Sequence, residues 1–137
     1  MRVTLPINVV AFETDYGGVV SNTRYLEYIE RGRYALFHAA GFNMEDYTRE
    51  HHVLFVVRKV EIEYLSPARH EDALELQIIV AEHTRTSTVL KFELRRKDEE
   101  LLLLRAQQTL VYINESWRPV RVPQIFRDAF PIEEPDN

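Results

Sequence analysis

The stretch Thr14-Asp15-Tyr16-Gly17-Gly18-Val19-Val20-Ser21-Asn22-Thr23-Arg24-Tyr25 decides how this chain is interpreted. The carboxylate of Asp15 lies just before two adjacent glycines, Gly17 and Gly18, and the whole chain contains only four glycines. Glycine is used where the backbone adopts unusual angles or comes close to another group. The stretch therefore predicts a tight loop that ends where an amphipathic helix begins.

This arrangement brings a carboxylate close to the free N–H groups of a helix N-terminus. The first N–H groups of a helix have no acceptor within the helix. Such donors can hold a developing oxyanion while the acid acts as a base or as a nucleophile, which is what hydrolysis of an ester or thioester needs. The alternative is that Asp15 is a turn aspartate beside two glycines, which is a common structural role.

One long helix is predicted after the loop, from about residue 22 to residue 40. Asn22 is a good N-cap candidate, and Gly41 follows as a stop at the C-terminal end. Gly32 is unusual there, because a glycine inside a helix costs about 1 kcal/mol relative to alanine. A helix pressed closely against a sheet would give this glycine a packing reason. The apolar residues that recur at helical spacing are Tyr25, Leu26, Ile29, Leu36 and Phe37.

Strand patterns dominate the rest of the chain. Before the long helix we expect a strand over residues 3–12. After it we expect a short second helix or structured loop over residues 43–52. Further strands are expected over residues 53–66, 73–82, 87–96 and 101–114, followed by a short helix over residues 124–130. One helix set apart from a mostly antiparallel sheet is an α+β arrangement, in which the helix covers one sheet face.

The strand over residues 53–66 is long enough to leave an edge that suits pairing with another subunit. Strict alternation would place four residues on one face of this strand, namely Val56, Val60, Ile62 and Tyr64. The same rule would place Glu13 on a strand face, and we expect it to be solvated surface. We expect a single domain over residues 1–130 and a polar tail over residues 131–137.

The composition excludes several classes of protein. Of the 137 residues, 45% are hydrophobic and 28% are charged, as in a soluble globular domain. A formal net charge of −5 argues against a general nucleic-acid-binding role. The absence of cysteine removes disulfides, a thiol nucleophile and cysteine-ligated metal sites. No apolar stretch approaches the roughly 20 residues of a membrane span, and no signal peptide is visible, so the cytoplasm is the expected compartment.

The remaining reactive side chains do not form a recognised site. The five histidines have no ligand spacing typical of a metal centre, so no metal is expected. The serines lack the sequence context of a nucleophile elbow, which disfavours a serine hydrolase.

The sequence resembles the hotdog-fold acyl-CoA thioesterases, specifically the 4-hydroxybenzoyl-CoA thioesterase-like group, over residues 3–130. Residues 12–25 are similar to the family pattern Asp-x-x-Gly-hydrophobic-Val-x-[His/Asn]-x-x-Tyr. Residues 60–69 look like the strand and turn of this family, and residues 114–123 look like its last strand and proline-bearing exit.

The resemblance implies a long central helix wrapped by a curved antiparallel sheet, with subunits joined edge to edge as a homodimer or homotetramer. It also implies an active site at the dimer interface, with coenzyme A lying across both subunits. By position, Asp15 would be the catalytic carboxylate, the backbone N–H of Asn22 would polarise the thioester carbonyl, and Gly18 would let the loop approach the substrate. The further substrate-binding candidates are Gly17, Val19, Tyr25, Arg58 and Lys59.

Two of these residues carry open alternatives. Several family members have Tyr-His where this chain has Ser21-Asn22, and asparagine can donate a hydrogen bond but cannot transfer a proton as histidine does. Tyr25 either shapes an acyl pocket or belongs to the core, where helix aromatics usually lie.

The resemblance predicts an acyl-CoA thioesterase that converts an acyl-CoA and water to a carboxylic acid and free coenzyme A. No cofactor is expected, because coenzyme A is part of the substrate. One alternative is a thioesterase that acts on acyl carrier protein, and another is a non-catalytic hotdog protein that binds acyl-CoA. Asp15 disfavours the second alternative, because a pure binding site gains nothing from an anion beside an oxyanion hole. The nature of the acyl chain, aromatic or aliphatic, stays open.

Overall fold

A computed structural model describes residues 1–134 and contains one five-stranded antiparallel sheet. The strand order is β1-β3-β4-β5-β2, so that β1 and β2 form the two edges. The strands are β1 Arg2–Asn8, β2 Val53–Tyr64, β3 Ala73–His83, β4 Ser87–Arg96 and β5 Leu102–Asn114.

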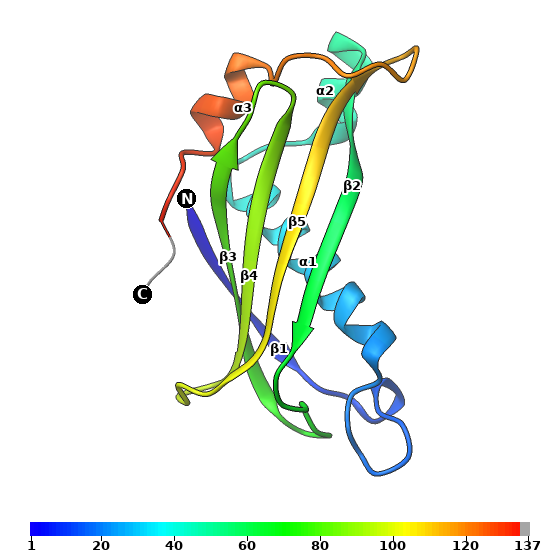
Figure 1. Ribbon diagram of the computed structural model, residues 1–137, viewed down its shortest axis with the longest axis vertical. Coiled ribbons are helices and arrows are strands. Elements are labelled where there is room, and N and C mark those ends of the chain that lie inside the picture. Colours follow the sequence, from blue (N-terminus) through cyan, green and yellow to red (C-terminus); the bar gives the residue numbers. More distant parts are fainter. Residues whose placement is uncertain (135–137) are drawn as a thin grey trace.

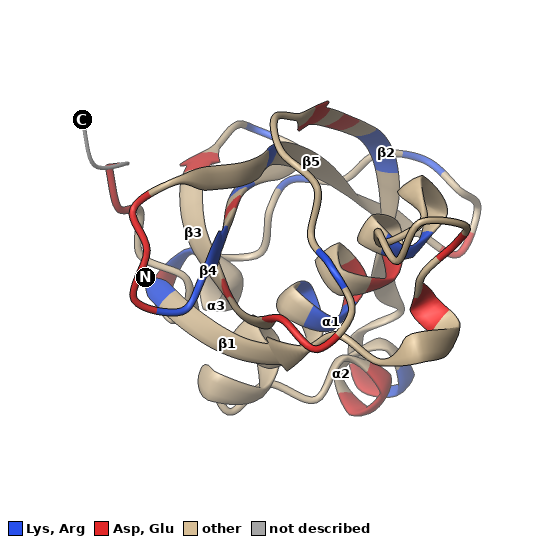
Figure 2. Ribbon diagram, turned by 90° about the horizontal axis from the view of Figure 1, so that it is seen from below, with Lys and Arg blue, Asp and Glu red and all other residues tan. Residues whose placement is uncertain are grey.

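The sheet curves around one long helix, α1 (Asn22–Ala39), which lies along its inner face (Figures 1 and 2). Two shorter helices, α2 (Met44–His51) and α3 (Gln124–Ala129), lie together at one end of the sheet (Figure 1). The loop between β1 and α1 lies at the other end (Figure 1). The predicted α+β class, with one long helix covering one sheet face, is confirmed.

Gly32 lets α1 approach the sheet closely. A Cβ atom added at this position would lie 2.8 Å from Cδ2 of Leu76 and 3.0 Å from Cγ1 of Ile78. Both residues belong to β3 and are fully buried against the helix. The packing reason expected for this glycine is confirmed, and it outweighs the cost of glycine in a helix interior.

A β-bulge changes which side chains of β2 face the helix. The register between β2 and β5 shifts between Val57 and Lys59, so one extra residue is inserted in β2. Val56 pairs with Val111 and Val60 pairs with Gln108, which places them on opposite faces of the sheet. The expectation that Val56 and Val60 share a face is wrong, because strict alternation fails at a bulge.

The ends of two other elements also differ from expectation. The strand β1 stops at Asn8, and residues Ala11–Glu13 form a short 3-10 helix, η1, before the loop. Ser21, with extended backbone angles, is the N-cap of α1, and Asn22 is the first helical residue. Leu26 is 43% exposed and does not belong to the buried stripe of α1.

The first residues after position 130 are attached to the sheet. Glu133 accepts a 2.7 Å hydrogen bond from Nε of Arg2, and its backbone N–H donates to the carbonyl of Val80 at 2.9 Å. The N-terminal amine of Met1 donates to the carbonyl of Pro131. Glu133 of the expected polar tail therefore contacts β1 and β3, and residues 135–137 of that tail lie outside the described residues. Over the described chain, no helix combines the length and apolarity that crossing a membrane requires.

Candidate active site

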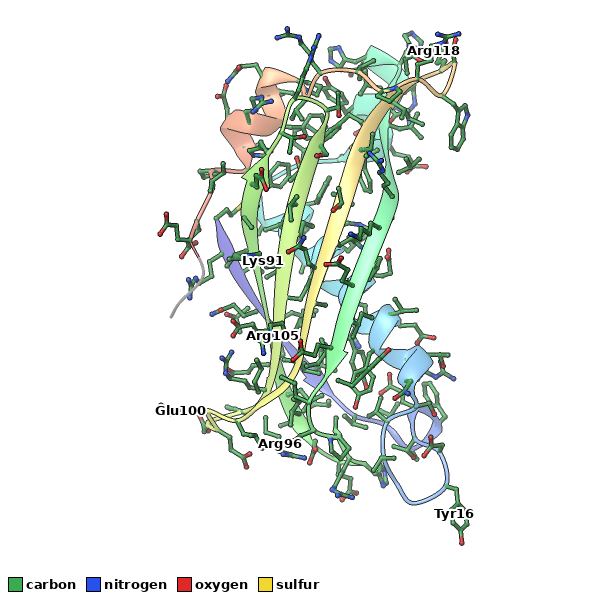
Figure 3. All side chains as sticks on the ribbon, viewed as in Figure 1. Tyr16, Lys91, Arg96, Glu100, Arg105 and Arg118 are labelled. Carbon is green, nitrogen blue, oxygen red and sulfur yellow. The ribbon has the colours of Figure 1, made fainter. Side chains whose placement is uncertain are left out.

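Residues 14–20 form a narrow loop that is closed by backbone hydrogen bonds. The N–H of Asp15 donates to the carbonyl of Val19 at 2.9 Å, and the N–H of Gly18 donates to the carbonyl of Asp15 at 3.1 Å. Gly17 and Gly18 have φ angles of +100° and +72°, a region that side-chain-bearing residues rarely adopt. The glycine pair is therefore required by the loop conformation. Tyr16, at the tip, points away from the rest of the molecule (Figure 3).

The turn that follows β2 holds this loop from one side. The N–H of Val20 donates to the carbonyl of Ala68 at 2.8 Å, and the N–H of His70 donates to the carbonyl of Gly18 at 2.9 Å. The hydroxyl of Tyr25, on the first turn of α1, accepts a 3.1 Å bond from the N–H of Ala68. Loop, turn and helix are thus linked through one short segment.

An ion pair fixes the turn itself. Nε of Arg96, at the end of β4, lies 3.0 Å from a carboxylate oxygen of Asp72, which also accepts the N–H of Arg69 at 2.8 Å. The same guanidinium donates to the carbonyl of Pro67 at 2.8 Å. Arg96 lies at the loop end of the sheet in Figure 3. Arg96 therefore has a structural role in this turn.

The N-terminus of α1 opens beside the loop. Ser21 makes no side-chain cap hydrogen bond to any residue of the described chain. The first-turn N–H groups, those of Asn22 and Thr23 among them, are available to a ligand because a helix offers them no internal acceptor. The helix dipole adds partial positive charge at the same place. This end of α1 can therefore stabilise a developing negative charge.

A pocket of about 530 Å³ contains the loop carboxylate and the helix N-terminus together. Asp15, Val19 and Asn22 line it from one side, and Tyr64 lines it from the end of β2. Among the described residues, Asp15 is the one carboxylate in the lining, and no Arg or Lys is part of it. The pocket thus offers an acid and hydrogen-bond donors, but no cation for a phosphate.

Tyr25 lies in the core and also lines this pocket, so neither interpretation of its role is decided by its position alone. It is 4% exposed and lies in the core cluster, yet it also lines this pocket. Its ring lies 5.5 Å from the ring of Tyr64 and 6.0 Å from that of Tyr28. Burial raises the pKa of the Tyr25 hydroxyl, so the phenol stays protonated and can donate a hydrogen bond.

The predicted site residues separate into two groups. Four of them line the pocket, namely Asp15, Val19, Asn22 and Tyr25. Gly17 and Gly18 shape the loop but do not line the pocket. Arg58 and Lys59 are exposed at the bulge of β2, where Nζ of Lys59 pairs with Glu61 at 2.7 Å. The structure does not bring these two cations to Asp15 within one chain, and the roles of all these residues stay predictions.

Glu13 is a residue that sequence reasoning missed. It was expected to be solvated, but it is 7% exposed and its carboxylate accepts a hydrogen bond from the hydroxyl of Tyr28 at 3.0 Å. The 3-10 turn of η1 interrupts the strand and directs this side chain inward. No local pattern signals the contact, because Tyr28 lies two turns into the following helix.

Two other pockets lie away from Asp15. One, of about 640 Å³, is lined by Phe37, Phe42 and Phe55 between α1, α2 and β2. The other, of about 610 Å³, lies on the outer face of the sheet beside Lys91 and Arg105 (Figure 3). Within residues 1–134, no group of three or more His, Asp or Glu side chains is placed to hold a metal ion. The Asp15 pocket is thus distinguished by its chemistry and not by its size.

Comparison with known proteins identifies the family. Residues 9–130 match the model of the thioesterase-like superfamily. The acyl-CoA thioesterase YbgC of Haemophilus influenzae is 30% identical over 128 residues, which are 93% of each chain. The acyl-CoA thioester hydrolase YbgC of Escherichia coli O6:H1 is 37% identical over 106 residues, which are 77% of each chain.

Solved structures agree on the fold. A probable thioesterase from Bartonella henselae has a TM-score of 0.80 at 28% identity and covers 90% of this chain and 100% of its own. A 4-hydroxybenzoyl-CoA thioesterase has a TM-score of 0.85 at 17% identity over 93% of this chain and 97% of its own, a similarity of fold alone. The resemblance noted from the sequence is confirmed. This chain has the hotdog fold and belongs to the thioesterase-like superfamily.

Proposed function

We propose that this protein hydrolyses acyl-CoA thioesters in the pocket that Asp15 shares with the N-terminus of α1. The observation that carries this proposal is the joint lining of one pocket by Asp15 and Asn22. The names of the YbgC relatives support acyl-CoA as the substrate and thioester hydrolysis as the reaction.

The reaction follows from the groups in the pocket. The thioester carbonyl oxygen accepts hydrogen bonds from the first-turn N–H groups of α1, beginning with that of Asn22, which stabilise the oxyanion. Asp15 either attacks the carbonyl carbon or removes a proton from an attacking water. In the first case a mixed anhydride forms and the C–S bond breaks, and water then opens the anhydride. The products in both cases are a carboxylic acid and free coenzyme A.

Asn22 cannot take part in proton transfer in this pocket. Its amide can donate a hydrogen bond to the acyl group, but it cannot exchange a proton. Proton transfer therefore falls to Asp15, the carboxylate of the pocket. Coenzyme A itself supplies the leaving thiol, and no further cofactor takes part in this scheme.

A second copy of the chain would complete the site. The 12-residue strand β2 ends the sheet and pairs on one side with β5. Antiparallel pairing of β2 with the β2 strand of a second subunit would satisfy its free edge and form an isologous dimer. In that arrangement the Tyr64 end of one β2 lies beside the Phe55 end of the other. The aromatic pocket of one subunit would then adjoin the Asp15 pocket of its partner.

Arg58 and Lys59 lie near the middle of the paired edge in this dimer. We retain them as candidates for the phosphates of coenzyme A, because no cation lines the Asp15 pocket in the described chain. Replacing both with alanine is then expected to raise KM and leave kcat unchanged. A cytoplasmic location and a homodimer or homotetramer remain part of the proposal.

The deciding experiment measures thiol release from aromatic, short-chain and long-chain acyl-CoAs, with wild-type protein and the Asp15→Asn variant side by side. Turnover by the wild type that disappears in the variant supports the proposal, and the preferred acyl chain then describes the pocket. The same panel is presented as acyl carrier protein thioesters, since two Arabidopsis thaliana relatives at 24% identity are named acyl-acyl carrier protein thioesterases. Turnover of the carrier-protein substrates alone contradicts the acyl-CoA assignment.

The dimer is tested separately by light scattering after size exclusion. A monomeric mass at micromolar concentration, together with full activity, would contradict the shared site.

A further inference from the structure

Glu13 is the one buried charged residue in the described chain, since the other buried polar residues, Ser87, Thr88 and Gln108, are neutral. It is not part of the Asp15 pocket lining. Burying a carboxylate is costly unless hydrogen bonds compensate for the water that it loses. The position of this group therefore needs an explanation.

The hydrogen bonds of Glu13 connect three segments. Its Oε1 atom accepts the backbone N–H of Val10 at 3.0 Å and the hydroxyl of Tyr28 at 3.0 Å. Its backbone carbonyl accepts the N–H of Ser21, the N-cap of α1, at 3.0 Å. One residue thus ties the chain before the loop to the start of α1 and to its second turn.

The burial of Tyr28 suits it as a hydrogen-bond donor to Glu13. It is 1% exposed and packs in the core, and Arg31 lies 6.0 Å from its ring centroid. Burial, together with the neighbouring Glu13 carboxylate, raises the pKa of its phenol. Tyr28 therefore stays protonated and acts as the donor to Glu13 at all ordinary pH values.

These bonds lie next to the reacting groups along the chain. Asp15 follows Glu13 by two residues, and Thr14 between them is fixed by a 2.7 Å bond from its hydroxyl to the carbonyl of Ala11 and by a β-bridge to Val20. The backbone that carries Asp15 thus starts from Glu13, and the helix end that carries Asn22 starts from Ser21, which Glu13 also holds.

We infer that Glu13 is a positioning residue for the hydrolysis proposed above: together with Tyr28 it fixes the spacing between Asp15 and the N-terminus of α1. The inference rests on that proposed function. Glu13 makes no contact with the substrate and transfers no proton. It sets where the carboxylate of Asp15 meets a carbonyl carbon whose oxygen is held by the helix. A displacement of this carboxylate by about 1 Å can cost roughly 100-fold in rate.

The test compares Glu13→Ala with Glu13→Gln in the full-length protein, using the acyl-CoA that the panel identifies. Glutamine keeps the length of the side chain and an oxygen that can accept both hydrogen bonds. We expect kcat to fall about 10-fold or more in Glu13→Ala with KM changed by less than about threefold, and to remain within about threefold of wild type in Glu13→Gln.

The chain offers a matched pair of controls that separates positioning from general stability. Tyr28 and Tyr112 are both fully buried, and each hydroxyl has one side-chain partner, Glu13 at 3.0 Å and Thr88 at 2.9 Å. Removing either hydroxyl with Tyr28→Phe or Tyr112→Phe should lower the thermal midpoint by a similar amount. Measured well below that midpoint, kcat should fall about threefold or more in Tyr28→Phe only.

The kinetics of these variants support or overturn the positioning role of Glu13. Wild-type kcat in Glu13→Ala, or an equal loss of kcat in both tyrosine variants, overturns the inference. A Glu13→Gln variant as slow as Glu13→Ala also overturns it, because the charge and not the hydrogen bonding would then matter. A wild-type protein without turnover on any acyl-CoA instead contradicts the proposed function, which is a different outcome.

Discussion

The two ends of the curved sheet are stabilised in different ways. At the end with α2 and α3, aromatic rings pack against one another: Phe126 lies 4.5 Å from Phe42 and 4.9 Å from Tyr112, centroid to centroid. At the end with the Asp15 loop, backbone hydrogen bonds and ion pairs such as Asp72 with Arg96 hold the segments together.

The difference shows how one fold provides both a core and a site. Apolar packing excludes water, so the aromatic end carries stability, and its packed rings supply neither an acid nor a base. The loop end leaves Asp15 exposed and the first N–H groups of α1 open, and it keeps its shape through directional bonds. The following predictions test whether activity and stability separate between the two ends.

The largest effect is expected for Asp15→Asn at the loop end. Asparagine has the same shape but can act neither as a base nor as a nucleophile, so kcat should fall by about 10²–10⁴. The thermal midpoint should not change, because the Asp15 side chain is exposed. Thiol-release kinetics and thermal unfolding monitored by circular dichroism measure the two quantities. Wild-type turnover in this variant would refute the mechanism.

The opposite pattern is expected for Phe126→Ala at the aromatic end. Phe126 is 0% exposed, and truncation of such a residue costs about 3–5 kcal/mol of unfolding free energy. Chemical denaturation followed by fluorescence gives this value. The fraction that stays folded should retain the kcat of the wild type, and a parallel loss of kcat would show that the two ends are coupled.

A matched glycine pair sharpens the comparison. Gly18 in the loop and Gly41 after α1 have φ angles of +72° and +70°, and an added Cβ would meet nothing within 4 Å at either position. Gly18→Ala and Gly41→Ala should therefore each lower stability by about 1 kcal/mol through backbone strain alone. Only Gly18→Ala should also reduce kcat, because it alters the loop that carries Asp15. Equal kcat in both variants would contradict a role for the loop conformation.

The smallest effect is expected from the titration of His83 at the aromatic end. Burial lowers the pKa of His83 below its usual 6.5, and the two ring nitrogens lie 2.8 Å from the Thr88 hydroxyl and 2.7 Å from the Phe130 carbonyl. His83 binds a proton at higher pH in the unfolded chain than in the folded one. The contribution of neutral His83 to the free energy of unfolding is therefore complete above about pH 6.5, and it is lost as the pH falls through the pKa of the folded state. His83→Gln should show a smaller loss of unfolding free energy between pH 7.5 and 5.5 than wild type.

Several parts of the fold could be predicted because neighbours in the sequence determine them. The left-handed angles at Gly17 and Gly18 follow from the glycines themselves, and α1 and the strands follow from hydrophobic periods of 3.6 and 2. The strands expected over residues 87–96 and 101–114 are β4 and β5, with residues 97–101 connecting them. The motif around Asp15 also pointed to the thioesterase-like superfamily, which the comparisons confirm.

Other features depend on contacts between distant segments and could not be obtained from local patterns. The bulge at Arg58 shifts the pairing of β2 with β5, and it places Val56 and Val60 on opposite faces of the sheet. Lys59 pairs with Glu61 outside the Asp15 pocket of its own chain, so its proposed contact with coenzyme A phosphates depends on a second subunit.

The sequence by itself determined the loop, the helix that follows it and the family, because backbone conformation and periodicity are properties of neighbouring residues. The burial of Glu13 against Tyr28, and the hydrogen bond that the Tyr25 hydroxyl accepts from the N–H of Ala68, depend on tertiary packing. Those contacts join residues 15 and 43 positions apart, and packing selects them only when the sheet has closed around α1.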